Sequence, residues 1–266
     1  MTLNDIYHAI DPVALSLGPL QIRWYGLAYV AGFICAFLVI AKLSQRWKIR
    51  INDDAFFTVV FCVIFGVILG GRLGYVLVYG DGYYLQHPEK ILAFNEGGMS
   101  FHGGLVGVII GGVIAAKITK IPFLTLADMG VVGVPIGLFF GRCANFINGE
   151  LWGAPTDMPW GVVFGGAAGT MPRHPSQLYE ALLEGVVLFI ILFALSRKTP
   201  ARPRGTFFGT FLLFYGLFRF TIEFIRQPDA QIGYLLGTHW FTMGQALSIP
   251  LMVAGVVFLI YAWKTK

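Results

Sequence analysis

The sequence predicts an all-α polytopic membrane protein with about seven transmembrane helices. Of its 266 residues, 56% are hydrophobic and only 12% are charged, whereas an average soluble domain is about 25% charged. Several apolar runs exceed the roughly 18 residues that indicate a membrane-spanning helix. The 34 glycines suit helices that approach one another closely in a membrane. This composition excludes soluble globular, disordered, collagenous and disulfide-scaffold proteins.

Seven apolar segments predict the spans, and we expect residues 1–266 to form a single transmembrane domain. The spans are predicted at about 24–43, 56–79, 99–117, 124–144, 177–195, 206–225 and 242–263. Residues 1–23 mix apolar and polar positions, and we expect them to lie on the membrane surface. Residues 145–176 are rich in Gly, Pro and Trp, and we expect an ordered loop or lid there.

The distribution of lysine and arginine predicts the orientation of the spans. Twelve of these residues lie in segments on one side, four lie on the other side, and three fall within spans. Because segments rich in Lys and Arg stay in the cytoplasm, the C-terminus is predicted to be cytoplasmic and the N-terminus periplasmic. The loop 145–176 is then periplasmic. This distribution also explains the net charge of +5 without a nucleic-acid partner.

Polar and charged side chains within the spans gather at the outer ends. Each charge in hydrocarbon costs about 2.5–3.5 kcal/mol on insertion scales, so a set of them on one side indicates a function. Only Asp128 belongs to the inner half. The outer set is Arg72, His102, Arg142, Asn145, Gln177, Glu180, Glu184, Arg219 and Glu223.

One face of the sixth span carries Tyr215, Arg219 and Glu223 at four-residue spacing, and Arg226 follows three residues later. Side chains at this spacing form a stripe along a helix. Arginine forms bidentate contacts with phosphate, so two or three arginines at the outer leaflet are suited to a phospholipid headgroup. The sequence leaves open that Arg219 and Glu223 merely neutralise each other.

The fifth span places Glu180 and Glu184 on one face, where two carboxylates repel each other. They need cationic partners or a raised pKa, and Arg72 and Arg142 are the obvious candidates. For Glu184, the deeper of the two, a purely structural network is an equal alternative.

His102 lies among glycines at the entrance of the third span. A histidine titrates near neutral pH and suits proton transfer, although a solvated interfacial histidine is the alternative. Cys35, Cys62 and Cys143 have no paired spacing, which predicts neither a disulfide nor a metal site.

The run 141-GRCANFINGELWG-153 resembles the signature of the bacterial prolipoprotein diacylglyceryl transferases. Further segments resemble that family in order and spacing, so the resemblance covers essentially the whole chain. They are Tyr25 in RWYG, GGRLGYV from Gly70, His102 in FHGG, 174-HPSQLYE-180, and YGLFRFTIEFIRQPD from Tyr215 to Asp229.

The resemblance implies a reaction at the periplasmic side of the bacterial inner membrane. The diacylglyceryl group of phosphatidylglycerol moves to the lipobox cysteine thiol of a preprolipoprotein signal peptide, a thioether forms, and glycerol 1-phosphate leaves. The nucleophile then belongs to the substrate, so the three cysteines are packing residues. Neither a metal nor a soluble cofactor is expected, and the partners are these two substrates and membrane lipids.

The same resemblance suggests roles for individual residues. His102 would take the thiol proton, Arg142 and Arg219 would stabilise the leaving phosphate, and Glu223 would orient Arg219. Tyr25 and Tyr215 would donate to the phosphate or orient the base. Gly153 would permit a tight turn after the signature. The expected catalytic residues are His102, Arg142, Tyr215, Arg219 and Glu223, and the expected substrate-binding residues are Tyr25, Arg72, Asn145, Glu150, Gly153 and Arg226.

Two other functions are considered. A secondary transporter, or a membrane protein that binds an anionic lipid, would also use intramembrane Arg, Glu and His. Transporters usually place such groups near the midplane, however, and here the inner halves lack polar lining. An intramembrane protease would need a serine or a paired aspartate at mid-depth. Neither Ser100 nor Ser176 is predicted to lie there, and Asp128 has no intramembrane partner.

Overall fold

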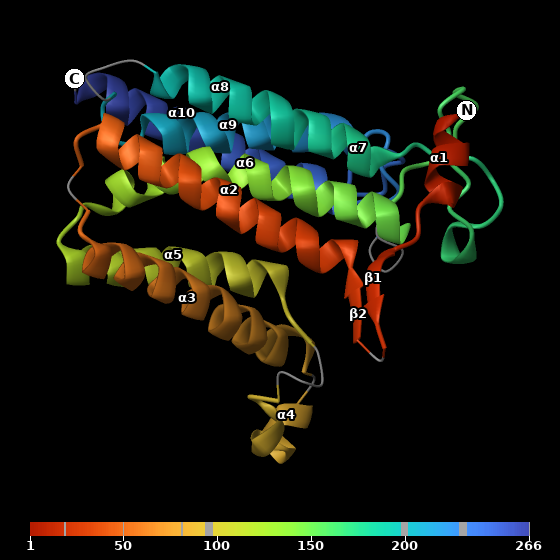
Figure 1. Ribbon diagram of the computed structural model, residues 1–266, viewed down its shortest axis with the longest axis horizontal. Coiled ribbons are helices and arrows are strands. Elements are labelled where there is room, and N and C mark those ends of the chain that lie inside the picture. The colour runs from red at the N-terminus through yellow and green to blue at the C-terminus, as the bar shows by residue number, and fades with distance from the viewer. Residues whose placement is uncertain are drawn as a thin grey trace. The chain divides into compact units, whose positions relative to one another are not determined.

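A computed structural model describes residues 1–18, 20–49, 51–80, 82–93, 98–197, 202–228 and 233–265. The chain divides into two compact units, which are described separately. Unit 1 consists of Met1–Trp47 and Asp128–Lys266, and unit 2 is Lys48–Ala127. Figure 1 shows that both are built mainly from long helices.

The N-terminal segment of unit 1 contains more structure than a surface-lying segment. Helix α1 (Leu3–Ala9) starts with a capping box, in which the Thr2 hydroxyl accepts from the Asp5 amide and the Thr2 amide donates to the Asp5 carboxylate. It leads into an antiparallel hairpin of β1 (Val13–Leu17) and β2 (Leu20–Arg23). Gly18 has a φ of +60° at the turn, a conformation that glycine adopts without steric cost. The purely helical prediction missed this hairpin.

Each of the seven predicted segments forms an apolar helix. The helices of unit 1 are α2 (Trp24–Arg46), α6 (Phe123–Asn148, which begins in unit 2), α7 (Ser176–Glu180), the π-helix η4 (Ala181–Val187), α8 (Leu188–Ser196), α9 (Thr206–Ile222) and α10 (Met243–Lys264). Those of unit 2 are α3 (Asp53–Tyr79), α4 (Tyr83–Gln86), the short helix η1 (Pro88–Lys90) and α5 (Phe101–Thr119). Among the described residues, α2, α3, α6, α10 and the continuous stretch Ser176–Ser196 are long and apolar enough to cross a membrane, and α5 and α9 are shorter.

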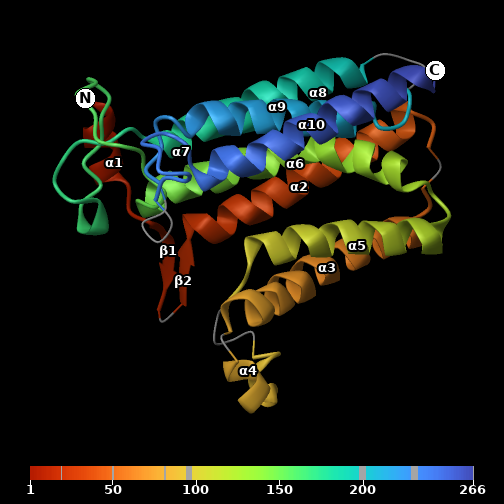
Figure 2. The same cartoon turned by 180° about the vertical axis from the view of Figure 1, so that it is seen from behind.

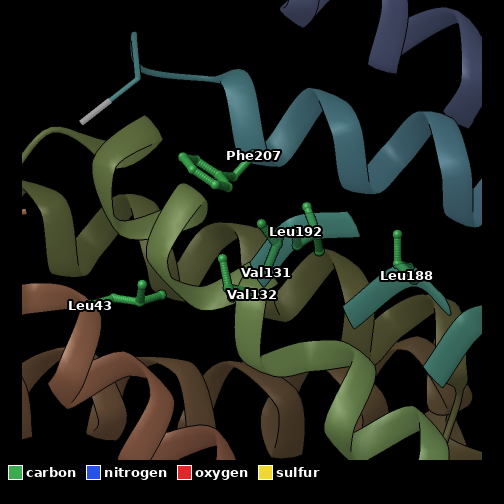
Figure 3. Close-up of a cluster of buried hydrophobic side chains, with 6 residues drawn as sticks. All are labelled: Leu43, Val131, Val132, Leu188, Leu192 and Phe207. Atoms are coloured by element: carbon green, nitrogen blue, oxygen red, sulfur yellow. The ribbon is translucent and has the colours of Figure 1, made fainter. Parts of the chain in front are cut away.

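Helices α2 and α6 pack closely and run antiparallel. A Cβ added to Gly32 would lie 3.3 Å from the Gly137 Cα, and one added to Gly133 would lie 3.0 Å from the Ala36 Cβ. Small residues at these crossings let the two backbones approach. Nearby, buried side chains from α2, α6, α8 and α9 form a hydrophobic core (Figure 3). Its members are Leu43, Val131, Val132, Leu188, Leu192 and Phe207.

Helices α9 and α10 form the second close pair of unit 1 and lie side by side in both ribbon views (Figures 1 and 2). Gly209 and Gly216 of α9 meet α10 where an added Cβ would approach its backbone to 2.9 and 3.0 Å. The N-terminus of α9 is capped from another helix. Asp128 of α6 accepts hydrogen bonds from the amides of Gly205 and Phe208 at 2.7 and 2.8 Å. This explains the lone inner-half carboxylate, because the first amides of a helix need acceptors.

In unit 2, α3 and α5 are joined by two glycine rows with four-residue spacing. Gly66 and Gly70 face Gly107 and Gly103, and an added Cβ on any of them would overlap a carbonyl or Cα of the other helix. The backbones therefore touch, as the glycine content predicted. Buried Arg72 donates from Nε, Nη1 and Nη2 to the carbonyls of Ile91, Gly98 and Lys90, at 2.7, 3.1 and 2.7 Å.

Candidate active site

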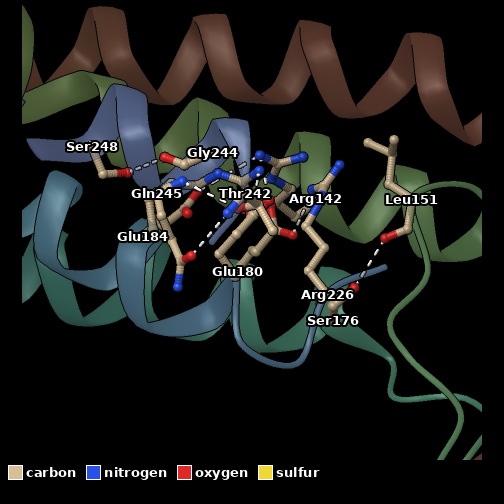
Figure 4. Close-up of polar contacts among 12 residues, drawn as sticks. Arg142, Leu151, Ser176, Glu180, Glu184, Arg226, Thr242, Gly244, Gln245 and Ser248 are labelled. Carbon is tan, nitrogen blue, oxygen red and sulfur yellow. Dashed lines mark hydrogen bonds and ion pairs between the residues drawn. The ribbon is translucent and has the colours of Figure 1, made fainter. Parts of the chain in front are cut away.

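The centre of the candidate site is the fully buried carboxylate of Glu180 in α7, which three arginines contact (Figure 4). Glu180 Oε2 lies 2.7 Å from Arg142 Nη2 of α6 and 3.5 Å from Arg219 Nη1 of α9. Glu180 Oε1 accepts a hydrogen bond from Arg226 Nη1 at 3.0 Å. Helices distant in the sequence thus converge on one anion. Together with Glu184 and Glu223, these residues are called the arginine–glutamate cluster.

Glu184 lies one helical turn beyond Glu180, within the π-helix η4. It is also fully buried, but its single ion pair among the described residues is a 3.7 Å contact with Arg142 Nη2. Neither of its carboxylate oxygens has a hydrogen-bond partner among the described residues. Short π-helical segments inside α-helices occur often at functional sites. Arg142 is therefore the predicted cation that meets both glutamates, whereas Arg72 donates to carbonyls of unit 2.

The predicted Arg219–Glu223 pair is present, with Nη2 and Oε2 at 2.9 Å. The helix ends at Ile222, three residues before the predicted end of the span, so Glu223 is its C-cap and Arg226 lies beyond it. The Glu223 carboxylate lies against the first turn of α10. A Cβ added to Gly244 would lie 2.5 Å from Glu223 Cδ, so a larger residue there would displace the carboxylate.

The first turn of α10 is held by hydrogen bonds between two polar residues, Thr242 and Gln245, that the sequence did not point to. The Thr242 hydroxyl accepts from the Gln245 amide, and the Gln245 side chain accepts from the Thr242 amide. Both residues are buried, and Gly244, which lies between them in the chain, brings this turn against the Glu223 carboxylate of the cluster. The signal that could have found them is the capping-box spacing of Thr242 and Gln245.

The loop after α6 is ordered and is attached to the cluster through Arg226. Gly153 does not form the predicted tight turn. It makes an antiparallel bridge with Arg226, and its amide donates to the His174 carbonyl at 2.9 Å. An added Cβ would lie 2.7 Å from the Ile225 carbonyl oxygen. Glycine is therefore needed here because two backbone segments approach from either side.

The signature residues Asn145 and Glu150 contact each other at the end of α6. Asn145 Nδ2 donates to Glu150 Oε2 at 3.3 Å, and the Glu150 amide donates to the Asn145 carbonyl. The buried Gln177 side chain donates to the Glu150 carbonyl, which ties the loop to α7. Arg173 braces the same loop from within, stacking over Trp152 at 4.4 Å and donating to the Ala168 carbonyl at 2.8 Å.

A histidine at the end of this loop, His174, is partly buried, and burial lowers its pKa below the ordinary value. Its Nδ1 lies 3.2 Å from the Tyr179 hydroxyl. The histidine thus helps to position the segment that leads into α7.

The two predicted tyrosines belong to the same unit as the cluster. Tyr215 is on α9, one turn before Arg219, and its ring stacks on Phe211. Tyr25 is in the first turn of α2 and is partly buried. The antiparallel register of Gly32 with Gly137 places Tyr25 at the level of residue 144 on α6, close to the height of Arg142.

His102 is in the first turn of α5 in unit 2, and its side chain lies outside the described residues. Asp229, the last residue of the YGLFRFTIEFIRQPD motif, also lies outside them. Among the described residues, no group of three or more His, Cys, Asp and Glu is arranged to hold a metal ion.

The arginines and glutamates of the cluster differ in how far they are exposed to solvent. The side chains of Arg142 and Arg219 are each 17% exposed, and that of Arg226 is 10% exposed. The carboxylates of Glu180 and Glu184 are fully buried, and Glu223 is 5% exposed. The cations are therefore the more exposed members of the cluster, and their counter-charges are the more deeply buried members. Such an arrangement presents guanidinium donors to an anion while keeping the buried charges compensated.

Known proteins resemble this chain over nearly its whole length. Residues 12–261 match the family model described as prolipoprotein diacylglyceryl transferase. The chain is 52% identical over 257 residues to the phosphatidylglycerol–prolipoprotein diacylglyceryl transferase of Geobacter sulfurreducens, covering 97% of each chain. It is 49% identical to the proteins of that name from Nitratidesulfovibrio vulgaris strain DP4, over 94% of each chain, and from Cupriavidus metallidurans, over 97% of this chain and 96% of the other. The chain belongs to the prolipoprotein diacylglyceryl transferase family.

Proposed function

We propose that this protein transfers the diacylglyceryl group of phosphatidylglycerol to the lipobox cysteine thiol of a preprolipoprotein. The names of its relatives state a lipid donor, phosphatidylglycerol, and a protein acceptor, prolipoprotein. The observation that carries the proposal is the set of three partly exposed arginine side chains held by a buried carboxylate. A phosphodiester is an anion of the size and geometry that such groups bind.

The reaction needs no nucleophile from the enzyme. The cysteine sulfur forms a bond to the carbon of the diacylglyceryl unit that carries the phosphate, and the bond between this carbon and the phosphate oxygen breaks. The electron pair of that bond goes to the phosphate, which leaves as glycerol 1-phosphate, and the thiol proton goes to a base. A thiolate attacks far better than a thiol, so a cation near the sulfur also helps.

The arginines stabilise the charge that develops on the departing phosphate. Arg142 and Arg219 are assigned this role because they are the more exposed members of the cluster. Preorganised donors at such a position are typically worth about 10²–10³ in rate each. Glu180 holds the arginines at their spacing, and Glu223 orients Arg219 through the 2.9 Å contact.

Supporting roles follow from placement. Arg226 ties the signature loop to Glu180, and Asn145 and Glu150 shape the loop where it leaves α6. Tyr25 is close to the height of Arg142 on the neighbouring helix, and Tyr215 is one turn before Arg219 on α9; these placements support a role of the two hydroxyls near the phosphate. For His102 as the base and Arg72 as a headgroup ligand, the support is the motifs that contain them.

The orientation that completes the proposal has the N-terminus in the periplasm and the C-terminus in the cytoplasm, with all seven apolar helices crossing the bacterial inner membrane. Its support is the asymmetry of Lys and Arg between the two sides. The cluster then lies toward the periplasmic leaflet, where translocated preprolipoproteins become accessible.

A transfer assay tests the proposal. Purified protein in detergent is mixed with phosphatidylglycerol and a synthetic lipobox peptide, and the peptide mass is followed. The expected result is a diacylglyceryl-sized gain on the cysteine with release of glycerol phosphate, and no gain on the matched peptide that has serine at that position. Arg142→Gln and Arg219→Gln should abolish the gain, whereas Arg204→Gln, an exposed arginine remote from the cluster, should retain it.

No mass gain by folded protein that retains phosphatidylglycerol would refute the proposal. It would leave the alternative, a transporter or lipid-binding protein for an anionic substrate, which flux measurements in vesicles would then examine.

A further inference from the structure

A second site lies at the other end of unit 1, between the last turns of α2 and α8. It is a pocket with a volume of about 210 Å³. Val39, Leu43 and Phe193 form an apolar wall, and Ser196 lies at the end of α8. This basic pocket, so named for the cations described next, plays no part in the proposed reaction.

Three cations line the basic pocket: Lys42 and Arg46 from α2 and Arg197 from the end of α8. Arg46 is fixed in place, because its Nη2 donates to the Arg197 carbonyl at 2.7 Å. None of the three forms an ion pair with a carboxylate among the described residues. The nearest candidate by height on α6 is Asp128, which is occupied by the first amides of α9. The pocket therefore gathers positive charge that no described anion neutralises.

A tryptophan at the rim of the basic pocket indicates a position at the membrane–water interface. Trp47, the residue after α2, donates from Nε1 to the Ser196 carbonyl at 3.4 Å and packs on Phe207 with ring centroids 4.7 Å apart. Tryptophan is enriched where the hydrocarbon meets the headgroups. Cations beside such a residue, above an apolar wall, match a lipid headgroup above its acyl chains.

The distance to the arginine–glutamate cluster shows that the two sites are separate. The antiparallel register of α2 and α6, in which Gly32 meets Gly137 and Ala36 meets Gly133, places Arg46 at the level of residue 123. Arg142 is nineteen residues farther along α6, or about 28 Å at 1.5 Å per residue. This is close to the roughly 30 Å thickness of a hydrocarbon core, so the pocket lies at the opposite membrane surface.

We propose that the basic pocket binds the phosphate of an anionic phospholipid in the leaflet opposite the active site. Lys42, Arg46 and Arg197 contact the phosphate, and Val39, Leu43 and Phe193 contact the first carbons of an acyl chain. The bound lipid joins α2 to α8 and so stabilises unit 1. In the orientation proposed above, this leaflet is the cytoplasmic one.

Lipid retention by the full-length protein in detergent tests the proposal, with dioleoyl phosphatidic acid as the probe because it is not the transfer substrate. Native mass spectrometry counts the lipids retained, and a titration gives the affinity. The test variant is Lys42→Gln/Arg197→Gln, which keeps the Arg46 hydrogen bond to the backbone. The control variant is Arg204→Gln/Lys264→Gln, which removes two exposed cations that do not line the pocket.

The expected result is that the test variant loses one bound phosphatidic acid and the control variant does not. Each basic residue near an anionic surface contributes about fivefold to affinity, so the loss of two should weaken this site roughly 30-fold. Dioleoyl phosphatidylcholine, which is zwitterionic, should not occupy the site. Without lipid, the wild type and the test variant should melt at the same temperature.

Equal retention of phosphatidic acid by the test variant would overturn the proposal. So would competition by millimolar inorganic phosphate, since the ligand would then be a soluble phosphate rather than a lipid. The transfer assay measures the proposed reaction and does not depend on lipid retention by the basic pocket. The two experiments therefore distinguish a failure of the proposed lipid site from a failure of the proposed reaction.

Discussion

Replacing Glu180 by glutamine removes the one carboxylate that three arginines share. Its contacts are 2.7 Å to Arg142, 3.0 Å to Arg226 and 3.5 Å to Arg219. At an effective dielectric constant of 20, each contact is worth about 5–6 kcal/mol of attraction before desolvation. The cost of burying these charges cancels most of that sum. Breaking a buried ion pair from one side typically costs about 3–5 kcal/mol, and this is the expected loss for Glu180→Gln.

Glu184→Gln is the matched control, because Glu184 is equally buried and lies one turn away on the same face. Its single ion pair is 3.7 Å long and its oxygens have no hydrogen-bond partner among the described residues. Glutamine in its place should therefore cost much less than Glu180→Gln, because the desolvation cost of a poorly paired buried charge is removed together with its attraction to Arg142. Removing this charge also relieves its repulsion with Glu180.

The assay is the free energy of unfolding in detergent from a denaturant titration, followed by transfer activity at a temperature where each variant is folded. Glu180→Gln should unfold several kcal/mol more easily, and its transfer rate should fall by about 10²-fold because the arginines lose their positions. If Glu184→Gln were as damaging as Glu180→Gln, or if Glu180→Gln were neutral, the reasoning from shared contacts would be refuted.

Three further substitutions test the helix contacts. Asp128→Asn keeps one acceptor for the two amides at the start of α9 and should cost about 1–3 kcal/mol of unfolding free energy; an unchanged value would reject the capping role. Gly107→Ala should prevent close packing of α3 and α5, which would lower both the expression level and the melting temperature of the protein. Gly104→Ala should be tolerated, because its added Cβ has no neighbour nearer than 3.7 Å. Gly244→Ala should displace the Glu223 carboxylate and lower kcat more than it raises KM. A changed melting temperature with a normal kcat would mean that the contact between Gly244 and Glu223 is only structural.

Much of the helical architecture could be predicted from sequence because it follows from local hydrophobicity. All seven apolar segments are helices, and the glycine rows of α3 and α5 do bring the backbones together. The Arg219–Glu223 pair was also predictable, since i and i+4 side chains on one helix always face each other.

The parts that sequence reasoning missed depend on contacts between distant segments. Glu180 was predicted to need a cation, but the convergence of three arginines from α6, α9 and the following loop is a property of helix packing. The bridge between Gly153 and Arg226 likewise joins residues far apart in the chain, so glycine there suggested a turn instead. The hairpin of β1 and β2 was missed because its strands are only five and four residues long.

The central claim is that the arginines of the cluster act on the departing phosphate, and the steady-state kinetics of Arg142→Lys and Arg219→Lys test it most directly. Lysine keeps the positive charge but loses the planar pair of donors. If these donors stabilise charge that develops in the transition state, kcat should fall about 10²–10³-fold while KM for phosphatidylglycerol changes only a few-fold. A raised KM with an unchanged kcat would show that the arginines only bind the headgroup, and would contradict the account.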